Sequence, residues 1–164
     1  MTETFTTYYQ SPLGLLQISG SNEYINKVHF IDDEKEEKGA TTDNPILEQC
    51  MEELNEYFAG TRLLFDIPIY QQGTPFQTRV WNEMAKINYG HTINYMTLAK
   101  CLGDPKCIRA AASTNGKNNI AIIVPCHRVI GTNNSLVGYA GGLWRKQWLL
   151  KHEGKIANGV QVLF

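Results

Sequence analysis

The chain has 164 residues, a hydrophobic content of 43% and a formal net charge of −1 at pH 7. This length allows one domain or two small ones with a buried core, and the composition excludes a disordered chain. No apolar stretch is long enough to cross a bilayer, and the N-terminus lacks the basic and apolar segments of a secretory signal. We therefore expect a cytoplasmic protein that does not act at a membrane.

The first half of the chain predicts a small α/β unit. Strands are predicted over residues 8–19 (interrupted by a turn at 11–14), 24–31 and 63–70. Pro68 places the last of these at a sheet edge, because proline cannot donate to a ladder. Asn44 and Pro45 are typical of a helix start and Gly60 of a helix end, with apolar residues at helical spacing between them. The polar stretch 32–44 predicts a connection.

The second half predicts helices separated by glycine-containing turns. The predicted helices cover residues 75–87, 94–102, 106–114 and 143–152. The second and third are joined by a turn at 103–105, which predicts a helix-turn-helix. We expect a flexible turn over 138–142 and a helix end at Gly154. The chain is therefore divided into domains 1–72 and 73–164.

Charge is divided unevenly along the chain. Residues 1–73 carry 4 Lys or Arg against 13 Asp or Glu, whereas residues 74–164 carry 11 against 3. A basic half of this kind favours a polyanionic partner. The alternatives are that the two halves simply attract each other, or that a solvated loop over residues 32–38 inflates the acidic count. The basic excess of the second half remains when this loop is left out, which favours the polyanionic partner.

The most informative stretch is 120–131. Residues 120–124 are apolar and largely β-branched, which predicts a buried strand, and Pro125 cannot continue its ladder. Cys126 is therefore expected where a strand gives way to irregular backbone, a typical position for a reactive side chain. The alternative, a small buried hydrophobe, is the commoner role of an isolated free cysteine.

A nucleophilic thiol in apolar surroundings needs a base, because burial raises the pKa of a thiol. His127 is the adjacent candidate. Neighbours on an extended chain face opposite sides, so we expect His127 to act through a water molecule. Its other ring nitrogen needs an acceptor, and the carboxylates of residues 74–164 are Glu83, Asp104 and Glu153. Glu153 is the best candidate, because its helix follows closely on the glycine-containing turn.

Metal binding is the rival use of cysteine and histidine. The chain has four cysteines, which we expect to be free thiols: Cys50, Cys101, Cys107 and Cys126. These cysteines and His127 do not fall into the paired spacings of a metal site, and an adjacent Cys-His pair rarely binds one ion. We therefore expect no metal and no cofactor.

The second helix of the predicted helix-turn-helix begins near Arg109 and continues with Ala110, Ala111 and Ala112. Three alanines are either good helix formers that pack on the core or a small face that approaches a nucleic-acid groove closely. In the second case Arg109 is the projecting cation. Tyr95, in the preceding helix, either contacts a phosphate or fills the interface between the helices.

The sequence Pro125-Cys126-His127-Arg128 resembles the active-site signature of the O6-alkylguanine-DNA alkyltransferases, which repair DNA by direct reversal. Further residues match this family at its spacing: Gly73 to Gln77, Val80-Trp81, Tyr95, Leu98-Ala99, Arg109-Ala110, Asn118, Gly138 to Gly142, Leu149-Leu150 and His152 to Gly154. The resemblance covers residues 73–154 densely and residues 1–72 only in layout.

The resemblance implies a ribonuclease-H-like N-terminal domain and a winged-helix-like C-terminal domain, an α/β (α+β) fold. It also implies that the helix-turn-helix enters the minor groove of double-stranded DNA and flips the damaged nucleotide into a pocket. The implied reaction is an irreversible, single-turnover transfer of the alkyl group of O6-alkylguanine, and of O4-alkylthymine, to Cys126. A monomer without cofactor or metal would carry it out.

Roles for individual residues follow from the resemblance. Cys126 would be the nucleophile and alkyl acceptor, His127 the base acting through water, and Glu153 the group that orients His127. Asn118 would brace the active-site turn, and Tyr95 would contact a phosphate and protonate the guanine. The implied DNA contacts are Arg109 (the intercalating finger), Tyr95, Ala110, Ser113 and Arg128. The implied pocket residues are Val129, Tyr139, Ala140 and Gly141.

The sequence departs from the family pattern in two ways. Asn119 stands where the family usually has a proline after Asn118, which predicts a looser turn. The N-terminal zinc ligands of some members have no counterpart here.

Three other functions are alternatives to repair by alkyl transfer. An alkyltransferase-like protein that only binds lesions lacks the cysteine, so Cys126 disfavours it. A cysteine hydrolase needs an oxyanion hole and leaves the basic half unexplained. A transcriptional regulator with a helix-turn-helix would bind one DNA sequence far better than others.

Overall fold

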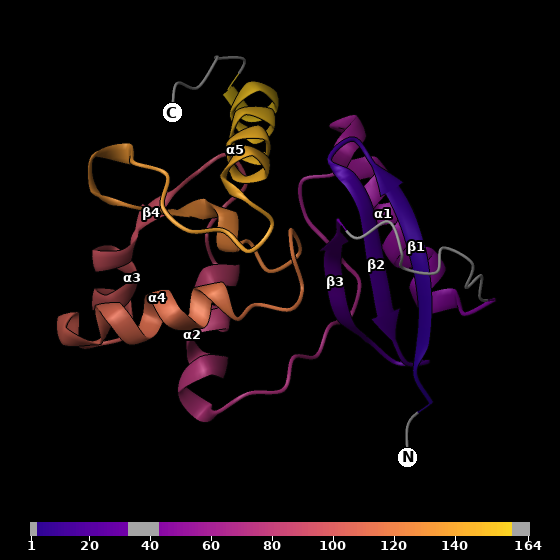
Figure 1. Cartoon of the computed structure of the whole chain (residues 1–164), viewed down its shortest axis with the longest axis horizontal. Coiled ribbons are helices and arrows are strands. Elements are labelled where there is room, and N and C mark those ends of the chain that lie inside the picture. The colour runs from indigo at the N-terminus through magenta and orange to yellow at the C-terminus, as the bar shows by residue number, and fades with distance from the viewer. Residues whose placement is uncertain (1–2, 33–42, 159–164) are drawn as a thin grey trace. The chain divides into compact units, whose positions relative to one another are not determined.

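The computed structural model describes residues 3–32 and 43–158 (Figure 1). The chain forms two compact units. The first comprises Met1–Gln71 and Asn119–Ala121, and the second comprises Gln72–Asn118 and Ile122–Phe164. The polar connection predicted over 32–44 lies mostly outside the described residues. Within the described ranges, no helix combines the length and the apolar character needed to cross a membrane.

The first unit is built on a three-stranded antiparallel sheet in the order β1–β2–β3. Its strands are β1 (Phe5–Ser11), β2 (Gly14–Gly20) and β3 (Ile25–Ile31). The turn between β1 and β2 requires a glycine, because Gly14 has a φ of 114°, which side chains disfavour. The sheet confirms the strands predicted over 8–19 and 24–31 and the turn between 11 and 14.

Helix α1 (Pro45–Ala59) lies against one face of this sheet (Figure 1). The Asn44 side chain accepts hydrogen bonds from the N–H groups of Ile46 and Leu47, and Gly60 ends the helix in a left-handed conformation. Both predicted ends of the helix are thereby confirmed. The buried face carries Leu47, Cys50, Glu53, Leu54 and Tyr57.

The strand predicted over 63–70 is wrong. Only Ile69 bridges to the sheet. Just before it, the buried Glu53 carboxylate accepts the N–H groups of Asp66 and Ile67 at 2.8 and 3.1 Å. A side chain from α1 therefore satisfies backbone donors that a strand would satisfy through its ladder, and the apolar pattern gives no sign of this.

The second unit is mainly helical. Its helices α2 (Pro75–Ala85), α3 (Tyr95–Cys101) and α4 (Ile108–Gly116) pack against one another. A short 3₁₀ helix, Pro105–Cys107, leads from the turn after α3 into α4. Figure 1 shows α3 and α4 together, and this pair confirms the predicted helix-turn-helix.

The buried strand predicted over 120–124 is also wrong. Ile120 alone bridges to β3, and residues 121–123 form a turn. Ile122 adopts a φ of 72°, a conformation that costs a β-branched residue on the order of 1–3 kcal/mol. The Asn118 side chain holds the end of this turn by donating to the Val124 carbonyl at 3.0 Å. The apolar residues predicted burial correctly but could not reveal the reversal of the backbone.

Two short strands and one further helix also belong to the second unit. Strands β4 (Ile93–Asn94) and β5 (Val129–Ile130) pair in parallel and bring the start of α3 to the segment after Cys126. They were not predicted, because two residues carry no periodicity. Helix α5 (Leu143–Asn158) continues through Gly154, so the predicted helix end is wrong. Gly154 does not adopt a positive φ, and a helical glycine costs only about 1 kcal/mol relative to alanine.

Candidate functional site

Cys126 begins a one-turn 3₁₀ helix, Cys126–Arg128, just before β5. The residue is buried, with 5% of its surface exposed. Burial raises the pKa of the thiol, whereas a hydrogen bond from Asn118 and the positive charge of Lys146 lower it. The Asn118 Nδ2 atom lies 3.3 Å from the sulfur, and the same atom donates to the Val124 carbonyl. Asn118 therefore holds the turn and stabilises negative charge on the sulfur.

Glu153, on α5, is held as a carboxylate by Arg128. The guanidinium donates to both oxygens, with Nε 2.8 Å from Oε1 and Nη2 3.1 Å from Oε2. Burial alone would raise the pKa of Glu153, but the charges and hydrogen bonds of His127 and Arg128 hold it well below its usual value. Glu153 is therefore ionised at neutral pH.

His127 is fully buried and shares a short hydrogen bond with Glu153, in which Nε2 and Oε2 are 2.7 Å apart. Burial lowers the pKa of His127, and Glu153 opposes this shift. An ionised carboxylate can only accept, so the ring proton sits on Nε2 and Nδ1 keeps its lone pair. Nδ1 is buried and has no hydrogen-bond partner among the described residues. The ring is thus arranged to accept a proton at Nδ1.

Arg128 was expected to contact DNA, and its position in the structure contradicts this prediction. Its side chain is instead buried, donates a further hydrogen bond from Nη1 to the Ile87 carbonyl at 2.7 Å, and lies over the Tyr89 ring. A buried carboxylate such as that of Glu153 needs a paired cation, and Arg128 supplies it. The Pro-Cys-His-Arg sequence gives no sign of this partner, which lies 25 residues further on.

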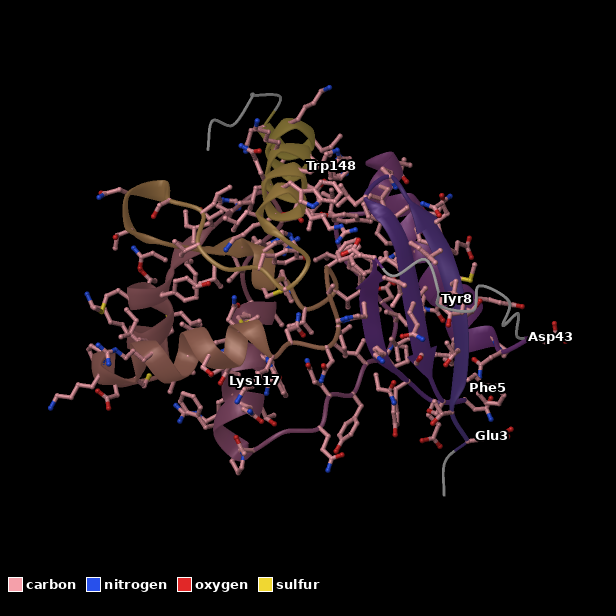
Figure 2. The ribbon with its side chains drawn as sticks, viewed as in Figure 1. Glu3, Phe5, Tyr8, Asp43, Lys117 and Trp148 are labelled. Atoms are coloured by element: carbon pink, nitrogen blue, oxygen red, sulfur yellow. The ribbon has the colours of Figure 1, made fainter. Side chains whose placement is uncertain are left out.

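Helix α4 presents three of the other predicted DNA contacts on one face. Arg109, Ala110 and Ser113 are all exposed. The opposite, buried face comprises Ala111, Thr114 and Asn115. The helix ends at its cap residue Lys117, labelled in Figure 2, directly before Asn118. Within the alanine run, Ala111 packs on the core and Ala110 lies on the exposed face.

Two tyrosines interact with the charge of Cys126. The Tyr95 hydroxyl donates to the Val137 carbonyl at 3.4 Å and accepts from the Asn115 amide at 3.3 Å. Burial and the sulfur raise the pKa of Tyr95, and the Asn115 bond lowers it. The Tyr139 hydroxyl is buried without a hydrogen-bond partner in the described ranges. Its pKa lies well above the usual value, mainly because of burial and secondly because of the charge on Cys126. Both phenols are therefore protonated at neutral pH.

The remaining predicted pocket residues lie on two segments. Val129 is buried, its N–H donates to the Cys126 carbonyl, and its own carbonyl accepts from Lys146 at 2.7 Å. Ala140 is exposed and Gly141 half-buried, on the turn before α5. Val129 is thus hydrogen-bonded to the backbone of Cys126. Ala140 and Gly141 lie on the other segment, in the turn that connects Tyr139 to α5.

Sequence reasoning missed Lys146, which is 0% exposed. A signal was present: Lys146 falls on the same helical stripe as Leu149, Leu150 and Glu153, at the spacing of a core-facing surface. A cation on such a stripe indicates an internal partner.

The cysteines form no disulfide, and the described residues also lack the grouping that a metal site requires. All four cysteines are free, and Cys101 is exposed whereas Cys50 and Cys126 are buried. In the described part of the chain, no three His, Cys, Asp or Glu side chains are grouped so that they could hold a metal ion.

Two family descriptions match the chain. Residues 4–71 match the ribonuclease-like domain of 6-O-methylguanine DNA methyltransferase, and residues 75–155 match the DNA binding domain of the same family. A Methanosarcina acetivorans relative named methylated-DNA–protein-cysteine methyltransferase is 42% identical over 149 residues, which is 89% of this chain and 96% of the relative. The constitutive enzyme of that name from Bacillus subtilis is 38% identical over 143 residues, covering 84% and 87%.

Solved structures agree with these matches. The crystal structure of Mycobacterium tuberculosis O6-methylguanine methyltransferase superposes with a TM-score of 0.83 at 36% identity, covering 96% of this chain and 97% of that one. The same organism's OGT in complex with DNA gives a TM-score of 0.84 at 38% identity, covering 93% and 94%. The predicted fold class is confirmed. With both domain matches in place and relatives similar over most of their length, the chain belongs to the 6-O-methylguanine DNA methyltransferase family.

Proposed function

We propose that this protein repairs alkylated DNA directly, by moving the alkyl group of O6-alkylguanine in double-stranded DNA onto Cys126. The proposal rests on one observation: a buried hydrogen bond from His127 to Glu153 fixes the tautomer of the histidine that follows Cys126 in the chain. The names of the relatives describe methylated DNA and a protein cysteine as the reaction partners, and one solved relative is bound to DNA.

In the proposed mechanism, His127 takes the proton of the Cys126 thiol at Nδ1 through one water molecule. The thiolate attacks the alkyl carbon, so a C–S bond forms while the bond from that carbon to guanine O6 breaks. The electron pair stays on guanine, and Tyr95, which burial keeps protonated, donates the proton that neutralises the leaving base. A thioether is stable to water, so each molecule reacts once.

DNA binding is proposed to use the exposed face of α4 in the minor groove. The small side chains of Ala110 and Ser113 allow the helix to approach the backbone, and Arg109 replaces the extruded base in the stack. Extrusion costs a few kcal/mol, and least for a weakly paired lesion. The N-terminal domain, 1–72, has a supporting role in this proposal, and the domain 73–164 carries the chemistry.

Replacing Arg109 by alanine should slow repair of duplex DNA by about tenfold or more, a loss of about 1.4 kcal/mol in transition-state stabilisation. Transfer from free O6-benzylguanine should change much less, since a free base needs no extrusion. Single-turnover rates with both substrates measure this difference. Lys155→Ala, which removes an exposed cation from α5, is the control. Equal losses with both substrates would exclude the intercalating role.

Repair itself is tested with a duplex that carries one O6-methylguanine. We expect the purified protein to restore guanine in an uncut strand, with rates that fall steeply with salt and depend little on flanking sequence. Binding without restoration would instead favour a protein that recruits other repair factors. Strong preference for one sequence would favour a regulator.

Three finer expectations stay predictions: a monomeric state, activity on O4-alkylthymine, and a cytoplasmic location. Sedimentation of the free protein tests the first. A duplex with O4-methylthymine, assayed beside the guanine lesion, tests the second, and fractionation of cells tests the third.

A further inference from the structure

The segment Asn119–Ala121 belongs to the first unit, although the residues before and after it belong to the second. It begins two residues after Lys117, which Figure 2 labels, and it leads into the turn before Cys126. Asn119 is also the position at which the chain has asparagine in place of the proline expected from the family pattern. None of the side chains in this segment takes part in the proposed mechanism, so its contribution must come from its backbone.

Two backbone hydrogen bonds hold this segment against β3. The Val28 N–H donates to the Asn119 carbonyl at 2.9 Å, and the Ala121 N–H donates to the Val28 carbonyl at 3.0 Å. Both bonds belong to the parallel bridge between Val28 and Ile120. They use the carbonyl of Asn119 but not its N–H.

A side chain from a distant part of the sequence binds the N–H of Asn119. The Gln71 Oε1 atom accepts this N–H in a short hydrogen bond of 2.6 Å. Gln71 is the last residue of the first unit before the chain enters the second. Proline has no N–H, so this bond requires a residue other than proline at position 119. A hydrogen bond therefore restrains the backbone where a proline ring would have restrained it by fixing φ.

The residue before this bond is the one that contacts the sulfur. The Asn118 Nδ2 atom lies 3.3 Å from the Cys126 sulfur and 3.0 Å from the Val124 carbonyl oxygen. The peptide unit between Asn118 and Asn119 is planar, so a bond to its N–H fixes the orientation of the whole unit. That orientation sets the ψ angle of Asn118, one of the backbone angles that direct its side chain. Gln71 thus acts on Asn118 through a single peptide unit.

The turn on the other side of the segment is strained. Ile122 has a φ of 72°, and such a conformation persists only where the surrounding contacts determine it. The contacts of Val28 and Gln71 restrain the chain just before Ile122, and the bond from Asn118 to the Val124 carbonyl restrains it just after. Removing one of these restraints allows the turn to relax and the side chain of Asn118 to move away from the sulfur.

We propose that Gln71 is a positioning residue for alkyl transfer, because its carboxamide oxygen holds the Asn119 N–H and thereby keeps the Asn118 side chain directed at the Cys126 sulfur. This inference rests on the proposed function of Cys126 as alkyl acceptor. Gln71 contributes only if residue 119 offers an N–H, so the effects of changing the two residues are coupled.

The first test is a double-mutant cycle of Gln71→Met and Asn119→Pro, with the rate of Cys126 alkylation by free O6-benzylguanine as the readout. Methionine keeps the length of the side chain without the amide oxygen, and proline removes the N–H. Gln71→Met alone should slow alkylation about threefold to tenfold, the range that one ordinary hydrogen bond supports. In the Asn119→Pro background, the same change should alter the rate by less than about twofold. Equal slowing in both backgrounds, or no slowing in either, would overturn the inference.

Two further variants control this cycle. Gln72→Met makes the same substitution at the next, exposed residue and should match the wild type. Gln71→Glu keeps an acceptor oxygen at the same reach and should retain most of the rate. A Gln71→Glu rate as low as that of Gln71→Met would contradict the role of the oxygen as an acceptor.

The second test needs neither the proline variant nor alkyl transfer. The hydrogen bond from Asn118 lowers the pKa of the Cys126 thiol, so Gln71→Met should raise this pKa by about 0.5–1 unit. The thiol pKa is read from the difference in thiolate absorbance between each protein and its Cys126→Ser counterpart. Amide hydrogen exchange at Asn119 should become faster in Gln71→Met, while that at Ala121 stays slow. Gln71 carries no charge, so a shift of the thiol pKa reports a change in geometry.

An unchanged thiol pKa in Gln71→Met would overturn the inference, as would unchanged amide exchange at Asn119. A wild-type protein that takes no alkyl group from O6-alkylguanine would instead refute the proposed function. The thiol pKa and the amide exchange do not depend on that reaction, so the two failures are distinguishable.

Discussion

Replacing Cys126 by serine should reduce alkyl transfer by more than about 10³-fold, to below detection, and leave binding to duplex DNA intact. Serine fills nearly the same buried volume, so the fold and the exposed face of α4 are retained. Its hydroxyl is far less acidic than a thiol, so His127 cannot supply an equivalent nucleophile. Transfer of labelled methyl from duplex DNA and a gel-shift titration measure the two properties.

Cys101→Ser is the matched control, because it makes the same substitution at an exposed cysteine. Transfer should be unchanged. Transfer that survives in Cys126→Ser would place the acceptor on another cysteine. Cys50 is the poorest alternative, since burial and the neighbouring Glu53 raise the pKa of its thiol to about 12.

Replacing Glu153 by glutamine should destabilise the protein by about 3–5 kcal/mol, because it leaves the Arg128 guanidinium buried without its counter-charge. Transfer should also slow, since a neutral amide no longer fixes the His127 tautomer. Thermal unfolding and single-turnover rates measure the two effects. Glu83→Gln breaks the ion pair with Lys86 on the surface and should cost less than about 1 kcal/mol. Equal losses in both variants would contradict the buried network.

The same residue makes stability depend on pH. The folded pKa of Glu153 lies below the unfolded value of about 4.3, so its contribution is present above that pH and is lost as the pH falls toward the folded value. Glu153→Gln should therefore lose less stability than the wild type between neutral pH and acid. Acid-unfolding curves that run parallel would count against this assignment.

The fold was predictable where local signals and packing agree. Asn44 and Gly60 mark the ends of α1 by their own backbone chemistry, and the helical apolar spacing between them faces the sheet. Prediction failed where a side chain outside the predicted strand forms hydrogen bonds with the backbone of that segment. Glu53 binds the segment expected to be a strand, and Asn118 anchors the turn that replaces the strand before Cys126.

The site was predictable to a similar extent. The adjacency of Cys126 and His127 gives the nucleophile and base candidates from local sequence, and resemblance together with helix position indicated Glu153. The prediction that Arg128 contacts DNA was wrong, because the burial of this side chain depends on a carboxylate on another helix. Lys146 was missed because a helical stripe shows that a residue faces inward but not which carbonyl groups it meets there.

In the proposed reaction, one buried sulfur takes the alkyl group permanently. Intact-mass measurement after incubation with a large excess of duplex containing O6-methylguanine tests it directly, with peptide mapping to locate the adduct. We expect every active molecule to gain one methyl group, on the peptide containing Cys126, and the number of lesions removed to equal the number of active protein molecules. Recovery of unmodified protein after many lesions per molecule have been removed, or a methyl group on any other residue, would contradict it.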